Sequence, residues 1–197
     1  MPFANLHFTR NIPERTSIAF PFESAIHAAS ELYYWSLKQI WTEPLKALYE
    51  RFETCLKLDL EYNEVPVIFK KDLPDHKGAV QMGKAILKVF HESIAQTVQE
   101  IVAVELPLLA TLYTDDGHPT DFNAGILDLV FRDKNGEIVI VDNKTASKPM
   151  PQSTADDSGQ MTAYAYLLAA NKYVFPTASV QCRFDTLRKQ NKRFTSR

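Results

Sequence analysis

Cysteine is scarce in this sequence. Of the 197 residues only Cys55 and Cys182 are cysteines, and neither belongs to a Cys-x-x-Cys pair or a histidine-rich segment. A disulfide framework and a structural zinc site are therefore not expected, and a reducing intracellular compartment is the default expectation.

Long hydrophobic runs are also absent. No apolar stretch approaches the roughly 20 residues that a membrane-spanning helix needs. The first residues, MPFANLHFTRNIPERTS, lack the pattern of a secretory signal peptide. We therefore expect no membrane partner and a cytoplasmic location.

Positive charge is in slight deficit but is unevenly distributed. The chain has 22 Lys and Arg against 24 Asp and Glu, which argues against a protein that is permanently coated with DNA. The segment Arg183–Arg197, however, holds six basic residues opposed only by Asp185. A basic end on an acidic body is typical of polyanion contact, and Arg188 and Lys189 are our candidate substrate-binding cations; the alternative is a solvated terminus.

Helical periodicity dominates the first hundred residues. Apolar residues recur every three or four positions in Ser24–Gln39, in a segment starting at Thr42 with Pro44 in its first turn, and in Met82–Ile94. Residues Asn63–Asp75 read as a loop or a short extended piece. We interpret residues 1–100 as the helical N-terminal part of a single structural domain, with a catalytic core and basic tail in residues 101–197.

The pattern changes to strands near Ile101. Lys134-Asn135-Gly136 supplies a strong hairpin signal between two apolar strands. A polar loop, TASKPMPQSTADDS, then precedes a helix and a last strand. The expected strands and helix are 101–113, 124–132, 137–144, 159–173 (the helix) and 178–184. This order predicts an α/β (α+β) fold with a central mixed sheet, preceded by a helical region.

Two acidic residues interrupt apolar strands. Asp128 lies in Ile126–Val130, and Asp142 ends the run that begins at Ile138. Buried carboxylates are costly unless they are paired or bind a metal. A turn at Asn135-Gly136 would bring both to the same end of the sheet. Lys144 lies two residues after Asp142 and so leaves the strand on the same face; carboxylates beside a lysine suit a divalent cation facing a phosphate.

Each of these residues also has an ordinary structural interpretation. Asp128 could cap a turn, and Asp142 with Lys144 could form a surface ion pair. A single short motif is weak support for function, so the combination of motifs carries the argument.

The motifs in combination resemble those of the RecB-like branch of the PD-(D/E)XK nuclease superfamily. The similarity lies in Gly125-Ile126-Leu127-Asp128, in Val139-Ile140-Val141-Asp142-Asn143-Lys144-Thr145 and in Gln160-Met161-Thr162-Ala163-Tyr164. Looser matches are the segment from Phe20 to His27 and the pair Val104-Glu105. The resemblance covers roughly residues 12 to 185 and implies a restriction-endonuclease-like core.

The resemblance assigns roles to these positions. It implies that Asp128 is the central metal ligand and that Asp142 and the backbone carbonyl of Asn143 add oxygens. His27 would add a nitrogen, which favours Mn²⁺ without excluding Mg²⁺, and Glu105 would be a further ligand. Without the resemblance, a lone histidine is more often a structural group, and Glu105 could equally pair with a lysine.

Three further residues receive roles in catalysis and substrate binding. Lys144 would orient the attacking water and offset charge on the phosphate. Gln160 and Tyr164 are four residues apart on one helix, so they share a face and could touch Lys144 or a phosphate. Their alternatives are a solvent-facing amide and a core aromatic.

The sequence also departs from the family pattern. It lacks the Cys-Pro helix that usually precedes the histidine segment, and Glu23 stands where a glycine is usual. Two cysteines cannot supply the four ligands of an iron–sulfur cluster, so no cluster is expected. The final basic run suggests a fragment or truncated reading frame of a longer family member.

The sequence therefore predicts a metal-dependent DNA nuclease that uses Mg²⁺ or Mn²⁺. We expect an exonuclease that acts in recombination, repair or phage DNA processing, with a helicase or recombination protein as a conceivable partner. The alternatives are a catalytically silent nucleic-acid-binding module of the same fold and a metal-free interaction domain.

Overall fold

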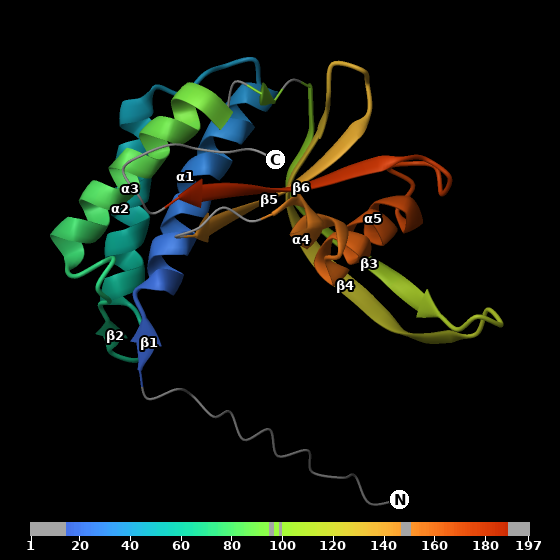
Figure 1. Ribbon diagram of the computed structural model, residues 1–197, viewed down its shortest axis with the longest axis horizontal. Helices are drawn as coiled ribbons and strands as arrows, with labels where there is room; N and C mark the ends of the chain where they lie inside the picture. The colour runs from blue at the N-terminus through green and yellow to red at the C-terminus, as the bar shows by residue number, and fades with distance from the viewer. Residues whose placement is uncertain (1–14, 95–96, 99, 147–150, 189–197) are drawn as a thin grey trace, which may run out of the picture.

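The computed structural model describes residues 15–94, 97–98, 100–146 and 151–188. Helices precede and flank a central sheet (Figure 1). The helices are α1 (Ala19–Lys38), α2 (Leu45–Glu61), α3 (His76–Val89), the π-helical turn η1 (Phe90–Ile94), α4 (Gln152–Asp156) and α5 (Gly159–Ala170). The strands are β1 (Thr16–Ser17), β2 (Val67–Ile68), β3 (Glu100–Tyr113), β4 (Pro119–Arg132), β5 (Ile138–Ala146) and β6 (Val180–Arg188).

The main sheet has the order β3-β4-β5-β6 and is mixed. Strand β4 runs antiparallel to both β3 and β5, whereas β5 and β6 are parallel. The β4–β5 turn forms where the Asn-Gly signal predicts it. Gly136 has a φ of 79°, a value that glycine adopts without strain, and its N–H donates to the carbonyl of Asp133 at 2.9 Å. The predicted architecture, a central mixed sheet with a helical region before it, is confirmed.

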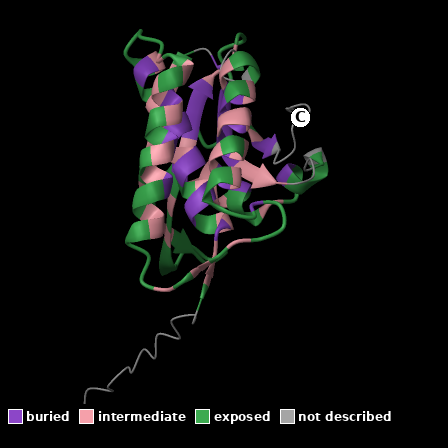
Figure 2. Cartoon of the chain, turned by 90° about the vertical axis from the view of Figure 1, so that its left-hand side faces the viewer, coloured by how far each residue is buried: buried purple, intermediate pink, exposed green. Residues whose placement is uncertain are grey.

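Helices α1, α2 and α3 form a layer on one face of the sheet. Their apolar stripes meet in a core that includes Phe22, Phe52 and Leu87 and that also takes in Leu129 and Val141 from the sheet. Outward helix surfaces are mostly exposed, and the buried residues gather toward the sheet (Figure 2). This packing fixes α1 against the strands and so determines where its polar residues lie.

The close contact between α2 and α3 depends on a glycine. A Cβ atom on Gly83 would lie 2.1 Å from Cζ of Phe52, inside the van der Waals distance. The Phe52 ring in turn meets Phe22 edge-on, with ring centroids 5.7 Å apart. The absence of a side chain at residue 83 therefore lets the three helices pack closely.

Helix α5 covers the opposite face of the sheet. Its Met161, Leu167 and Leu168 pack with Leu127 and Ile140 in a second core. Ser158 begins the helix as its N-cap, because its hydroxyl accepts a hydrogen bond from the N–H of Met161 at 3.3 Å. The sheet is thus sandwiched between two helical layers.

Several boundaries differ from the sequence prediction. Pro44 is the N-cap of α2 and not part of its first turn. The polar segment expected to be a loop contains the short helix α4, and the last strand extends four residues further, to Arg188. Arg183 and Asp185 therefore belong to β6 and not to a tail. Within the described ranges we find no helix with the length and apolarity of a membrane span.

Candidate metal-dependent active site

The candidate site forms where β4 and β5 separate. Their pairing runs from Arg132–Ile138 to Leu129–Val141. Beyond that point β4 continues beside β3 only, and β5 continues beside β6. Asp128 and Asp142 are the next residues on the two strands, so both carboxylates lie at the fork, as the hairpin argument predicted. The N–H of Asn143 donates to Oδ2 of Asp128 at 2.8 Å and spans the opening.

Three side chains from three elements converge beside this fork. His27 of α1, Glu105 of β3 and Asp128 of β4 each offer one ligand atom, and these atoms lie within 4.8 Å of one another. A nitrogen and two carboxylate oxygens suit Mn²⁺ or Mg²⁺. We call these three residues the metal cluster.

The histidine of the metal cluster is held from both sides of its ring. Its Nε2 lies 2.7 Å from the backbone oxygen of Asn143, and its Nδ1 lies 3.4 Å from Oδ2 of Asp128. Because a carbonyl can only accept, Nε2 carries a proton and donates it to Asn143. The Nδ1 atom therefore faces the Asp128 carboxylate, where a proton or a cation between the two groups would be stabilised. This donor set fits a divalent metal.

Glu105 has an unusual backbone conformation and an unusual side-chain pKa. Its φ of 47° lies in the left-handed region, which is uncommon for a residue with a side chain and is found preferentially at functional sites. Burial and, after it, the charge of Asp128 raise the pKa of Glu105 to about 7. The cluster thus places two carboxyl groups side by side, and a bound cation would offset the repulsion between them.

Asp142 and Lys144 form a second group at the fork. Nζ of Lys144 lies 2.7 Å from Oδ2 of Asp142, and the Asp142 side chain is almost fully buried. Burial raises the pKa of Asp142, while its hydrogen bond with Lys144 works against that rise. Burial alone would lower the pKa of Lys144, but the hydrogen bond and negative charge of Asp142 raise it above its ordinary value. The ammonium group therefore stays charged beside the metal cluster.

Gln160 and Tyr164 complete this second group from α5. Nε2 of Gln160 donates to Oδ1 of Asp142 at 2.9 Å and to the hydroxyl of Tyr164 at 2.8 Å. The two residues lie on one helical face, as their spacing predicted. Both Asp142 oxygens are thus engaged by side chains, and Asp142 is not one of the three residues whose ligand atoms converge.

Glu23 is a contributor for which sequence reasoning assigned no role. Its Oε1 accepts a hydrogen bond from the N–H of Thr145 at 3.3 Å, and its charge helps to raise the pKa of Lys144. Glu23 precedes His27 by four residues, so the two share a face of α1. That spacing was the available signal, but only the packing of α1 on β5 shows that this face meets the strand.

The structure does not extend the site to the predicted cations. Arg188 is the last residue of β6, its side chain is not described, and Lys189 lies outside the described residues. Arg183 does not act as a free cation, because its Nε lies 3.0 Å from Oδ1 of the fully buried Asp185. Its guanidinium also stacks over the Phe131 ring, 5.2 Å from the centroid.

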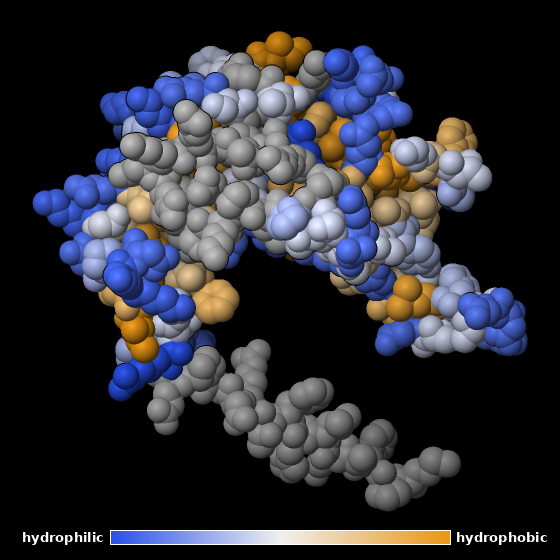
Figure 3. Space-filling model, viewed as in Figure 1, coloured by the Kyte–Doolittle hydropathy of each residue, from blue (hydrophilic) through white to orange (hydrophobic). Residues whose placement is uncertain are grey.

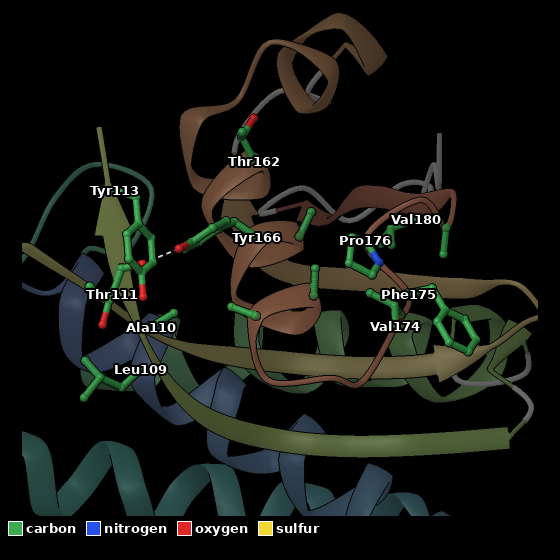
Figure 4. Close-up of a pocket in the computed structure, with 14 residues that line it drawn as sticks. Leu109, Ala110, Thr111, Tyr113, Thr162, Tyr166, Val174, Phe175, Pro176 and Val180 are labelled. Carbon is green, nitrogen blue, oxygen red and sulfur yellow. Dashed lines mark hydrogen bonds between the residues drawn. The ribbon is translucent and has the colours of Figure 1, made fainter. Parts of the chain in front are cut away.

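A cavity of about 980 Å³ lies on the α5 side of the sheet, and none of the residues of the fork or the metal cluster lines it. Its lining is mostly apolar, with residues such as Ala110, Val174 and Pro176, and includes no charged residue (Figure 4). Tyr166 reaches from α5 across one end and donates a hydrogen bond to the backbone oxygen of Thr111. The residues for metal and phosphate chemistry gather at the fork instead.

Comparison with known proteins gives one result. The family model of the PD-(D/E)XK nuclease superfamily matches residues 8–196. Among curated proteins, none matches this sequence. The family match includes every residue of the fork and of the metal cluster, and it spans nearly the whole sequence. The chain therefore belongs to the PD-(D/E)XK nuclease superfamily.

Proposed function

We propose that this protein is a divalent-metal-dependent deoxyribonuclease that hydrolyses phosphodiester bonds. The observation that supports this most directly is the position of the metal cluster beside the Asp142–Lys144 pair. One group can hold a cation, and the other presents a positive charge to the same opening between strands. Superfamily membership supplies the expectation of nuclease chemistry.

We assign the residues at the fork three roles: metal binding, orientation of the attacking water, and positioning of other side chains. His27, Glu105 and Asp128 would hold Mg²⁺ or Mn²⁺, and the carboxylate of Asp142 and the carbonyl of Asn143 would add oxygen ligands. A bound cation would lower the pKa of a water molecule and polarise the phosphoryl oxygen. Lys144 would orient the attacking water and offset negative charge as it develops on the phosphate. Gln160 and Glu23 would hold Asp142 and the Lys144–Thr145 backbone in position.

The finer assignment rests on the sequence motifs. From the series around Asp128, Asp142 to Lys144 and Gln160 to Tyr164, we infer that the protein is RecB-like and acts as an exonuclease. A role in recombination, repair or phage DNA processing, in concert with a helicase or recombination protein, follows from that resemblance. Arg188 and Lys189 would then contact the DNA backbone.

The direct test is cleavage of labelled DNA in Mg²⁺ or Mn²⁺, with EDTA as the metal-free reference. The Lys144→Ala variant is expected to lose at least about a hundredfold in rate, the size of a lost transition-state contact. Lys134→Ala, which removes a lysine from the β4–β5 turn, serves as the matched control. Full activity in purified, folded Lys144→Ala protein would contradict the assignment of Lys144. DNA binding without cleavage by the wild-type protein would instead support the silent binding module.

A further inference from the structure

A buried ion pair lies beside the fork, and the proposed chemistry does not use it. Both of its residues, Arg183 and Asp185, belong to β6. Nε of Arg183 lies 3.0 Å from Oδ1 of Asp185, and Nη2 donates to Oδ2 at 3.0 Å. The guanidinium also covers the ring of Phe131, and Nη2 donates to the hydroxyl of Thr97 at 3.3 Å. Contacts with β4 and with the segment before β3 thus hold the pair in one arrangement.

The ion pair stands next to the residue that joins the two sides of the fork. Asp185 is the register partner of Asn143 on the adjacent strand β5. Asn143 donates its N–H to Asp128 at 2.8 Å, and its carbonyl accepts a hydrogen bond from His27 at 2.7 Å. At this position β5 has separated from β4, so in the described sheet only β6 still pairs with it. The position of the Asn143 backbone, and with it the spacing of His27 and Asp128, therefore depends on β6.

Helix α1 meets the same ion pair from the other side. Leu187, two residues after Asp185 and so on the same face of β6, packs in the core that the sheet forms with α1, α2 and α3. Tyr34 lies seven residues after His27, two turns along α1 and on the same face. Burial and, after it, the charge of Asp185 raise the pKa of Tyr34. The ion pair therefore lies between the sheet and the helix that carries His27.

Stability does not account for a charge pair in this position. Asp185 is fully buried, and replacing a buried ion pair with apolar residues of similar volume often leaves a fold equally or more stable. A surface pair shows the contrast. The side chains of Lys84 and Glu53 remain 40% and 42% exposed, and hydrophilic side chains gather over α2 and α3 (Figure 3). What the buried pair offers is direction, because a guanidinium and a carboxylate fix each other's orientation.

We propose that the Arg183–Asp185 pair is a positioning element of the metal cluster. It fixes Asn143 against β6, and Asn143 in turn sets the spacing between Nδ1 of His27 and the carboxylate of Asp128. Neither residue of the pair is a ligand. Because the histidine supplies the nitrogen of the cluster, the pair also determines the preference for Mn²⁺ over Mg²⁺. This inference rests on the proposed function and names what tunes cation binding at the same site.

The test replaces the charge pair with apolar residues and measures cation binding by isothermal titration calorimetry. The Arg183→Met/Asp185→Leu protein is expected to bind Mn²⁺ at least about tenfold more weakly than the wild type, the usual cost of losing a group that orients a ligand. Mg²⁺ affinity should fall less, so the ratio of the two affinities should drop. Urea denaturation confirms that the protein is folded, and a structural role alone would not change this ratio.

Two further variants complete the design. Arg183→Lys keeps the positive charge but loses the fork of nitrogens that faces the carboxylate, and its Mn²⁺ affinity should fall about three- to tenfold, the value of one hydrogen bond. Lys84→Met/Glu53→Leu is the matched control. It removes an ion pair between α3 and α2 with an Nζ–Oε1 distance of 2.5 Å, whose lysine also lies over the ring of Tyr49. Its Mn²⁺ affinity should equal that of the wild type.

Several results would overturn the inference. Wild-type Mn²⁺ affinity or an unchanged affinity ratio in the folded Arg183→Met/Asp185→Leu protein is one, and wild-type affinity in Arg183→Lys is another, which applies even where the double variant does not fold. A wild type that binds no Mn²⁺ would contradict both this inference and the metal cluster. DNA cleavage in Mn²⁺ is assayed separately, so absent cleavage with intact Mn²⁺ binding would contradict the nuclease function alone.

Discussion

Strand β4 passes through two different environments, and the functional residues lie at the boundary between them. From Leu129 to Arg132 it is paired on both sides, with β3 and β5, and it is mostly buried. From Pro119 to Ile126 it is paired with β3 alone. Every residue from Pro119 to Phe122 is exposed, and exposed and half-buried residues alternate from Asn123 to Ile126. In the first part apolar groups are inside the fold; in the second a row of apolar groups remains uncovered.

The difference explains why carboxylates can occupy this boundary. Where β4 and β5 separate, their backbones are no longer paired with each other. The N–H of Asn143 donates instead to the side chain of Asp128. The half-buried position is polar enough to hold carboxylates and dry enough to strengthen their interactions with a cation.

The largest expected effect is on stability, and it separates two adjacent residues on opposite faces of β4. Leu127 is fully buried and Ile126 is 55% exposed. Leu127→Ala should lower the free energy of unfolding by about 2–5 kcal/mol, because it leaves a cavity against α5. Ile126→Ala should change it by no more than about 0.5 kcal/mol. Urea denaturation monitored by circular dichroism measures both, and equal losses would show that Ile126 is covered in solution.

A second comparison sets a histidine at the fork against one on the hairpin turn. His27→Ala should weaken Mn²⁺ binding by at least about tenfold, since it removes a ligand of the metal cluster. His118→Ala removes a histidine whose Nε2 lies 3.5 Å from a carboxylate oxygen of the exposed Asp116, away from the fork, so Mn²⁺ affinity should be retained. Isothermal titration calorimetry makes the measurement, and equal affinities in the two variants would remove His27 from the ligand set.

The raised pKa of Glu105 predicts a pH-dependent stability in the metal-free protein. An acid whose folded-state pKa, about 7, exceeds its ordinary value of 4.5 binds more protons when folded. Its contribution to stability is thus fully present below about pH 4.5 and is lost as the pH rises through 7. Glu105→Gln should therefore raise Tm at pH 8 by about 2–4 °C, the change that about 1 kcal/mol makes in a chain of this size. Solvent screens this half-buried group, so a larger change is not expected.

The control for this prediction lies on the same strand. Glu100→Gln alters an exposed carboxylate 3.8 Å from Arg132. At each pH its Tm should be nearly the same as that of the wild type. Saturating Mn²⁺ should reverse the order and make the wild type more stable than Glu105→Gln, because a carboxylate at residue 105 binds the cation more strongly than a neutral amide does. Thermal unfolding between pH 4 and 8 would refute the prediction if the Glu105→Gln protein showed no advantage at pH 8.

The smallest effect is expected at Glu23. Glu23→Ala removes the acceptor of the Thr145 N–H, and we expect DNA cleavage to fall roughly three- to tenfold, the value of one hydrogen bond. Glu23→Gln keeps an acceptor oxygen and should lose less. Rescue by glutamine separates positioning of β5 from the charge effect on Lys144. Glu50→Gln, at a surface ion pair on α2, is the control and should cleave at the wild-type rate.

Local pattern was sufficient for much of the fold. The helices that contain Ala29 and Ile86, the Asn135-Gly136 turn and the strands carrying Asp128 and Asp142 all appear close to where the sequence pattern predicted them. These features depend on residues near one another in sequence, for which spacing is informative. The helix α4 was not predicted, because its short polar segment has no apolar periodicity.

The sequence by itself determined the residue types of the site and two of its spacings. Asp142 to Lys144 fixes one face of a strand, and Gln160 to Tyr164 fixes one face of a helix. The tertiary structure decided which faces meet. It joined α1 to β5 through Glu23 and Thr145, grouped His27 with Glu105 and Asp128, and paired Arg183 with Asp185 instead of leaving it as a free cation. These contacts join residues far apart in the chain, and they exist only because burial of the two cores fixes the helices against the sheet.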